Sequence, residues 1–120
     1  MRRLSSWIRP ANKIYGAICV YLLIGAAWGF AYVILELTNP GSFSGLVDTA
    51  KFDYAGRAMQ MRYFSFATMT TLGFGDILPR SPVARTLSML EAVMGQIYLT
   101  VLIARLVGLH IVQASSPGDD

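Results

Sequence analysis

Two long apolar runs, over residues 14–37 and 83–113, constrain the fold of this chain more than any other feature. A helix of about 24 residues is about 36 Å long, and the hydrocarbon core of a bilayer is about 30 Å thick. Neither run shows the one-sided apolar pattern of a helix in a soluble bundle. The sequence therefore predicts an all-α membrane protein with two transmembrane helices, over residues 14–37 and 82–113.

Composition agrees with one small membrane domain, because 54% of the 120 residues are apolar and only 14% are charged. The net charge of +3 could indicate a nucleic-acid partner, but the basic residues are scattered, so nucleic acid is not expected. A single cysteine and a single histidine exclude an intrachain disulfide and a metal cluster built from these residues.

Residues 1–13 are basic and contain no acidic side chain, with Trp7 among them. This pattern is typical of a segment at the level of the lipid headgroups, and it predicts a cytoplasmic interfacial segment. A signal peptide is the alternative, since it also begins with basic residues, but its apolar region would be only about 7 to 15 residues long. Residues 114–120 are expected to form a cytoplasmic tail.

The middle of the chain is more polar than the two runs. Pro40 and Gly41 end the first helix, and residues 38–61 are predicted to form a surface turret. Residues 62–70 are too few to cross a membrane and are predicted to form a short re-entrant helix. Non-helical backbone at membrane depth is tolerated only where protein buries it or it lines a water-filled cavity, so this geometry requires partner chains.

Residues 71–76 follow the short helix, and glycine occupies alternate positions there, at Gly73 and Gly75. Glycine adopts positive φ at little steric cost, so it can reverse every second peptide and point consecutive carbonyl groups in one direction. Stacked carbonyl oxygens would form a ladder of ligands for a dehydrated cation. This segment is therefore the candidate functional site.

The string Thr71-Leu72-Gly73-Phe74-Gly75 resembles the selectivity filter of two-transmembrane pore-domain potassium channels. The resemblance extends over about residues 12–112 and departs from the commonest filter at Leu72 and Phe74. It implies the tetrameric potassium-channel pore architecture, with an outer helix over 14–37, a pore helix over 62–70, a filter over 71–76 and an inner helix over 82–113. It also implies passive potassium conduction by a homotetramer in membrane lipid, without catalysis and without any cofactor besides permeant potassium ions. By the same resemblance both termini are cytoplasmic, and a bacterial inner membrane is the expected location.

The resemblance also implies roles for the filter residues. The potassium ligands would be the backbone carbonyls of Thr71, Leu72, Gly73 and Phe74, together with the Thr71 hydroxyl. The filter would be supported by Tyr63, Gly75 and Asp76. Tyr63 is the expected donor to Asp76, because Ala67 stands where some relatives carry a glutamate and because Phe74 has no hydroxyl.

Potassium selectivity is the favoured function, since family members with a glycine-phenylalanine-glycine filter can be selective. A non-selective monovalent cation channel is the alternative. A non-conducting membrane partner subunit and a small transporter subunit are further alternatives, against which the uninterrupted filter argues.

The second long run carries an apolar stripe at helical spacing. On it, Gln96 and Leu99 are assigned to a cavity, and Ile103, Val107 and Ile111 to a gate that closes by dewetting. Gly95 matches the hinge glycine of the family, and close packing against the pore helix is the alternative that its missing side chain also permits.

Glu91 lies about 100° to one side of this stripe, assuming helical geometry. A carboxyl group within a transmembrane segment is costly, which marks the residue as a functional candidate. It is expected to face the pore helix or a neighbouring subunit. Two roles stay open, a protonated and hydrogen-bonded structural residue or a residue that tunes permeation.

Overall fold

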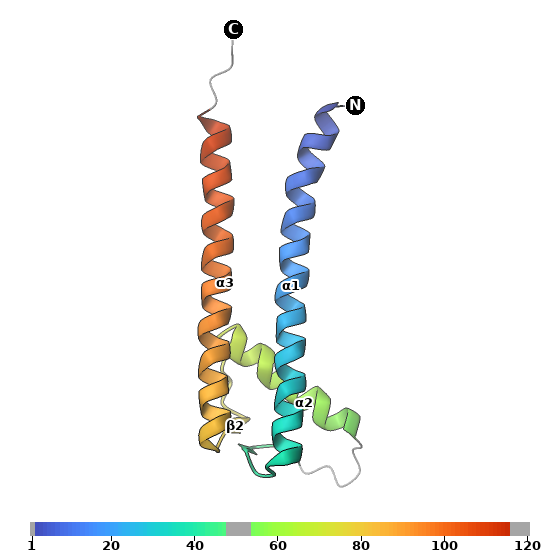
Figure 1. The fold of residues 1–120 in the computed structure, drawn as a ribbon, viewed down its shortest axis with the longest axis vertical. Helices are drawn as coiled ribbons and strands as arrows, with labels where there is room; N and C mark the ends of the chain where they lie inside the picture. Colours follow the sequence, from blue (N-terminus) through green and yellow to red (C-terminus); the bar gives the residue numbers. More distant parts are fainter. Residues whose placement is uncertain (1, 48–53, 116–120) are drawn as a thin grey trace.

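The computed structural model describes residues 2–47 and 54–115. The elements in chain order are α1 (Arg2–Thr38), β1 (Phe43–Ser44), α2 (Tyr54–Met69), β2 (Leu78–Pro79) and α3 (Pro82–Ala114). Helices α1 and α3 run side by side in opposite directions, so the start of α1 and the end of α3 lie at the same end of the molecule (Figure 1). The shorter α2 lies beside them in the other half.

Within the described residues, two helices are long and apolar enough to cross a membrane, Ala11–Thr38 and Pro82–Ala114. Their mean hydropathies are 2.2 and 1.8. Only 22% of the most apolar 18-residue stretch of the first helix is buried, and only 6% of that of the second. The core helix of a soluble protein would instead be mostly buried. The two predicted transmembrane helices are therefore confirmed.

Local signals fix the neighbouring ends of these two helices. Ser81 caps α3, its side chain accepting a hydrogen bond from the Ala84 amide, and Pro82 occupies the first turn, where its missing N–H is harmless. After α1, the Glu36 carboxylate accepts hydrogen bonds from the amides of Gly41 and Phe43, at 2.9 and 3.1 Å. These bonds hold the turn that follows α1.

Two predicted boundaries differ from the structure. Helix α2 begins at Tyr54, so residues 54–61, which the sequence assigned to the turret, are helical. Packing of Met61 in the buried core, with Ala58 against it, outweighs the helix-weakening Gly56. Helix α1 begins at Arg2, so residues 2–13 are helical and continuous with the outer helix, while their interfacial location stays a prediction. Residue 1, turret residues 48–53 and tail residues 116–120 lie outside the described part of the chain.

A short antiparallel pairing of β1 with β2 was not predicted. Phe43 pairs with Pro79 and Ser44 with Leu78. Next to this pair, the Ser42 carbonyl accepts hydrogen bonds from the amides of Arg80 and Ser81, at 2.7 and 3.2 Å. The end of α1 is thereby held beside the start of α3.

The buried core lies at this same end of the molecule, where α1, α2 and the paired strands meet. The rings of Tyr32, Phe43 and Phe64 pack edge to face with centroids 5.1 to 5.4 Å apart. Glycines in α1 let α2 approach closely, since a Cβ on Gly25 would lie 2.5 Å from Phe66 Cε1 and one on Gly29 would lie 2.9 Å from Arg62 Cα. The position of α2 is therefore set by direct packing on the α1 backbone.

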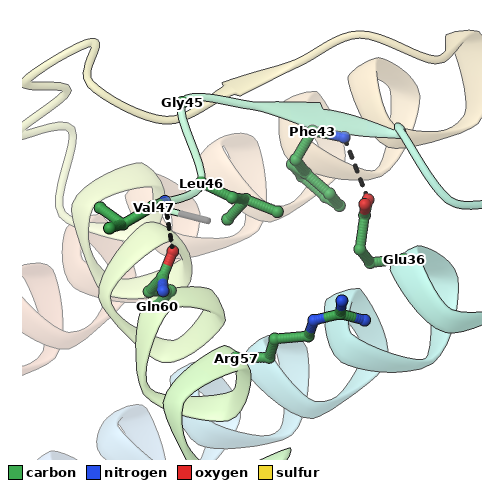
Figure 2. A pocket seen from close by; sticks show the side chains of 7 residues that line it. All are labelled: Glu36, Phe43, Gly45, Leu46, Val47, Arg57 and Gln60. Carbon is green, nitrogen blue, oxygen red and sulfur yellow. Dashed lines mark hydrogen bonds between the residues drawn. The ribbon is translucent and has the colours of Figure 1, made fainter. Parts of the chain in front are cut away.

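A cavity of about 310 Å³ opens beside the core, between the loop after β1 and the helices α1 and α2 (Figure 2). The Gln60 side chain accepts a hydrogen bond from the Val47 amide at its edge, at 3.2 Å. The full lining is Glu36, Phe43, Gly45, Leu46, Val47, Arg57 and Gln60. None of these residues belongs to the predicted filter.

Candidate functional site

The backbone of residues 71–75 alternates in the way that the glycine spacing predicted. Positive φ values occur at Thr71, Gly73 and Gly75, at 61°, 54° and 78°. The residues between them, Leu72 and Phe74, do not share this conformation. Thr71 is not a glycine, and the left-handed region costs such a residue about 1 to 3 kcal/mol, so the surrounding structure must hold it there.

Hydrogen bonds to the end of α2 hold this segment. The Thr71 amide donates to the Thr68 carbonyl and the Gly73 amide to the Ala67 carbonyl, both at 3.1 Å. The carbonyl end of α2 therefore meets the start of the segment directly. A helix carries partial negative charge at this end, which favours a cation nearby.

Residues 70–76 are all exposed in the single chain. The side chains of Leu72 and Phe74 are large and apolar, yet 58% and 66% of their surfaces are accessible. These two side chains leave the segment open to lipid or to another protein chain. Within the described part of one chain, nothing covers this segment from solvent.

Tyr63 connects α2 to the far end of the segment. Its ring stacks on the Phe74 ring, with centroids 6.3 Å apart and an angle of 8° between the planes. Partial desolvation, followed by hydrogen bonding to the Asp76 carboxylate and its negative charge, raises the pKa of the Tyr63 hydroxyl. The loop after β1 also packs here, because a Cβ on Gly45 would overlap the Asp76 carbonyl oxygen at 1.8 Å.

Helix α3 reaches the other end of the segment through Gly95 and Gln96. The Gln96 side-chain amide donates to the Thr71 hydroxyl at 3.5 Å. Gly95 is buried, and a Cβ there would lie 2.6 Å from the Met69 carbonyl oxygen at the end of α2. Close packing, the alternative considered for Gly95, is thus observed, while its role as a hinge stays a prediction.

The remaining predicted residues lie elsewhere on α3. Leu99 is half-buried, whereas Ile103, Val107 and Ile111 are exposed on the part of α3 away from α2. The structure therefore gathers Tyr63, the filter segment, Gly95 and Gln96, and it leaves the three gate candidates apart from them.

Glu91 is fully buried between α3, α1 and α2, with 0% of its surface exposed. The Tyr32 hydroxyl donates to its Oε2 at 2.5 Å, and the Ser65 hydroxyl lies 2.5 Å from its Oε1. Of the two expected neighbours, Glu91 thus faces the pore helix. Tyr32 and Ser65 were missed from sequence, because their separations from Glu91 of 59 and 26 residues follow no pattern.

Comparisons with known proteins agree with this geometry. A family model described as "Ion channel" matches residues 16–110. The chain is 33% identical over 86 residues to the inward rectifier potassium channel Kirbac3.1 of Paramagnetospirillum magnetotacticum, in an alignment covering 68% of this chain and 24% of that protein. It is 23% identical over 99 residues to two pore potassium channel a of Oryza sativa subsp. japonica, covering 82% of this chain and 24% of that one. The chain thus spans about a quarter of the length of these relatives.

Proposed function

Because this chain belongs to the ion-channel family built on the two-transmembrane potassium-channel pore, we propose that it is the pore subunit of a potassium-selective channel. It conducts potassium passively across a membrane as a homotetramer. Proteins of this family are channels and not enzymes. The membrane that we propose is a bacterial inner membrane, with both termini on the cytoplasmic side.

The observation that carries the proposal is the alternating backbone at Thr71, Gly73 and Gly75, held at the carbonyl end of α2. In this conformation the carbonyls of residues 71–74 serve as stacked ligands that replace the hydration shell of potassium. The Thr71 hydroxyl is the innermost ligand. Four α2 helices directed at one axis add their partial negative charges there.

The exposure of the filter supports the tetramer. A single chain leaves residues 70–76 uncovered, and non-helical backbone at membrane depth needs protein around it. Closed cyclic symmetry places identical walls around one axis, so four copies complete each ring of carbonyl ligands. The exposed side chains of Leu72 and Phe74 are then covered by neighbouring subunits.

The first prediction is that potassium permeates much better than sodium. Purified chain is reconstituted in liposomes, and the reversal potential is measured with potassium on one side and sodium on the other. A reversal potential near the potassium equilibrium value supports the proposal. Equal permeabilities would instead assign the chain to non-selective cation channels, and no current from the purified chain would favour a non-conducting partner subunit.

The second prediction concerns the support of the filter by Tyr63. Tyr63→Phe keeps the ring that stacks on Phe74 and removes only the hydroxyl that interacts with Asp76. We expect current to decay faster during sustained opening, because the filter loses a connection to α2. Current decay after a voltage or concentration step measures this.

Tyr15→Phe is the matched control, since Tyr15 lies in α1 with 68% of its surface exposed. It should leave the decay unchanged. If Tyr63→Phe decays at the rate of Tyr15→Phe, the hydroxyl does not support the filter.

A further inference from the structure

We propose that Glu91 is held as a neutral acid and acts as a positioning residue, joining the filter-bearing α2 to both spanning helices. The effect on conduction rests on the proposed channel function. The protonation of Glu91 does not, because it follows from contacts within one chain.

The site around Glu91 is closed without help from any partner. Glu91, Tyr32 and Ser65 each have 0% exposed surface in the single chain. Water and neighbouring subunits therefore do not reach the carboxyl group. Its hydrogen-bond partners must come from the residues already described.

No cation faces this carboxyl group within the described residues. From α1 it meets the Tyr32 hydroxyl, and from α2 the Ser65 hydroxyl. On its own helix, the Ser88 hydroxyl already donates to the Ala84 carbonyl, at 2.7 Å. The Tyr21 hydroxyl of α1 donates to the Met69 carbonyl, at 3.4 Å, and not to Glu91. A buried carboxylate without a cation is strongly disfavoured, whereas the neutral acid is not.

Counting protons leads to the same result. Three short oxygen contacts exist, Tyr32 to Glu91 Oε2, Ser65 to Glu91 Oε1, and Ser65 to the Gly25 carbonyl at 2.7 Å. Each hydroxyl has one proton to donate, so Tyr32 and Ser65 supply two protons for three contacts. The third proton belongs to Glu91. Its Oε1–H donates to Ser65, which donates in turn to Gly25.

These hydrogen bonds connect α1, α2 and α3 next to the predicted filter. Ser65 lies in the same turn of α2 as Ala67, whose carbonyl accepts the hydrogen bond from the Gly73 amide. A shift of α2 at Ser65 therefore moves the acceptor that holds the filter. Ionisation of Glu91 removes the donor to Ser65 and leaves a buried charge, so it loosens this connection.

Infrared spectroscopy tests the proton directly. The sequence contains only two glutamates, Glu36 and Glu91, so full-length chain in liposomes can be labelled with ¹³C at the glutamate carboxyls alone. We expect a neutral-acid carbonyl band at neutral pH that E91Q removes. E36Q is the matched control and should keep the band, since Glu36 lies in the turn after α1, where it accepts two backbone N–H bonds away from Glu91. Wild-type protein without the band would overturn the proposal, whether or not the chain conducts.

Two substitutions of similar size test the positioning role. Glutamine supplies an oxygen for Tyr32 and an N–H for Ser65, so E91Q should keep the wild-type permeability ratio and tetramer melting temperature. Leucine supplies neither, so E91L should lower the melting temperature and speed the loss of current. If E91L does not assemble, Ser65→Ala and Tyr32→Phe replace it in the test. Each removes one hydrogen-bond partner of Glu91, so each should lower the melting temperature and speed the loss of current by a smaller amount.

A pH series completes the test. As the pH rises through the range in which a solvent-exposed glutamate ionises, the unfolded chain loses the proton that folded Glu91 keeps, so the wild-type melting temperature should fall, while that of E91Q should fall less. The wild type and E91Q both contain Tyr32, so a difference between their pH profiles is due to ionisation of Glu91 and not of Tyr32. Equal pH profiles, or E91L matching the wild type in stability and conduction, would refute the positioning role.

Discussion

Gly73→Ala is expected to abolish potassium-selective current. Gly73 has φ of +54°, a conformation that costs residues with a side chain about 1 to 2 kcal/mol. A Cβ there has room, since the nearest other atom is the Thr71 carbonyl oxygen at 3.9 Å. The effect is therefore conformational, because the peptide turns to relieve the strain and takes its carbonyl out of the ligand ring. All subunits of the proposed homotetramer carry the change, and reversal potentials in liposomes measure it.

Gly41→Ala is the matched control for Gly73→Ala. Gly41 also has a positive φ, +86°, with nothing near its missing Cβ, but it lies in the turn after α1. Gly41→Ala introduces a similar conformational strain in the backbone away from the filter, so it should reduce the stability of the protein and keep its selectivity. Selective current in Gly73→Ala, or loss of selectivity in Gly41→Ala, would contradict the assigned role of the filter backbone.

Gly95→Ala is expected to lower the temperature at which the proposed tetramer dissociates and to alter the proposed conduction. The added methyl group would lie 2.6 Å from the Met69 carbonyl oxygen and 2.7 Å from Met69 Cγ. Backbone cannot rotate away as a flexible side chain can, so α3 or the end of α2 must shift. Overpacking of this kind costs about 1 to 3 kcal/mol per site. Thermal dissociation followed by gel electrophoresis measures the effect.

The hinge role predicts a different result for the same substitution. Alanine favours a straight helix by about 1 kcal/mol relative to glycine, so a hinge mutant should open less often while keeping its stability. Gly108→Ala is the control, because Gly108 lies in the same helix with nothing within 4 Å of its missing Cβ. A Gly95→Ala tetramer as stable as the Gly108→Ala tetramer, with reduced open probability, would favour the hinge over packing.

The features that the sequence predicted correctly depend on local chemistry. The spanning helices follow from continuous apolar runs, and the positive φ values at Gly73 and Gly75 follow from the absence of a Cβ. Thr71 adopts the same conformation for another reason. Its amide is bonded to the end of α2, an arrangement that no single residue reveals.

The features that were missed depend on contacts between distant parts of the chain. The first half of α2 is too polar to suggest membrane burial, and its helix is fixed by packing of residues such as Met61 in the core. Strands of two residues show no alternation of polar and apolar side chains. The partners of Glu91 are a tyrosine and a serine of ordinary type, although a serine within an otherwise apolar buried face is the signal that could have marked Ser65.

The pairing of β1 with β2 has a consequence for how such a chain can vary. Everything between Ser44 and Leu78 leaves and returns at the same place, where the Ser42 carbonyl also holds Arg80 and Ser81. The pairing thus joins the end of α1 to the start of α3, and the segment between the two strands begins and ends at this junction. Lengthening a closed loop costs little entropy, and segments whose ends lie together are readily exchanged. A change of loop length within this segment can therefore be absorbed while the pairing still holds the two spanning helices together, provided that α2 keeps its packing on α1 and α3.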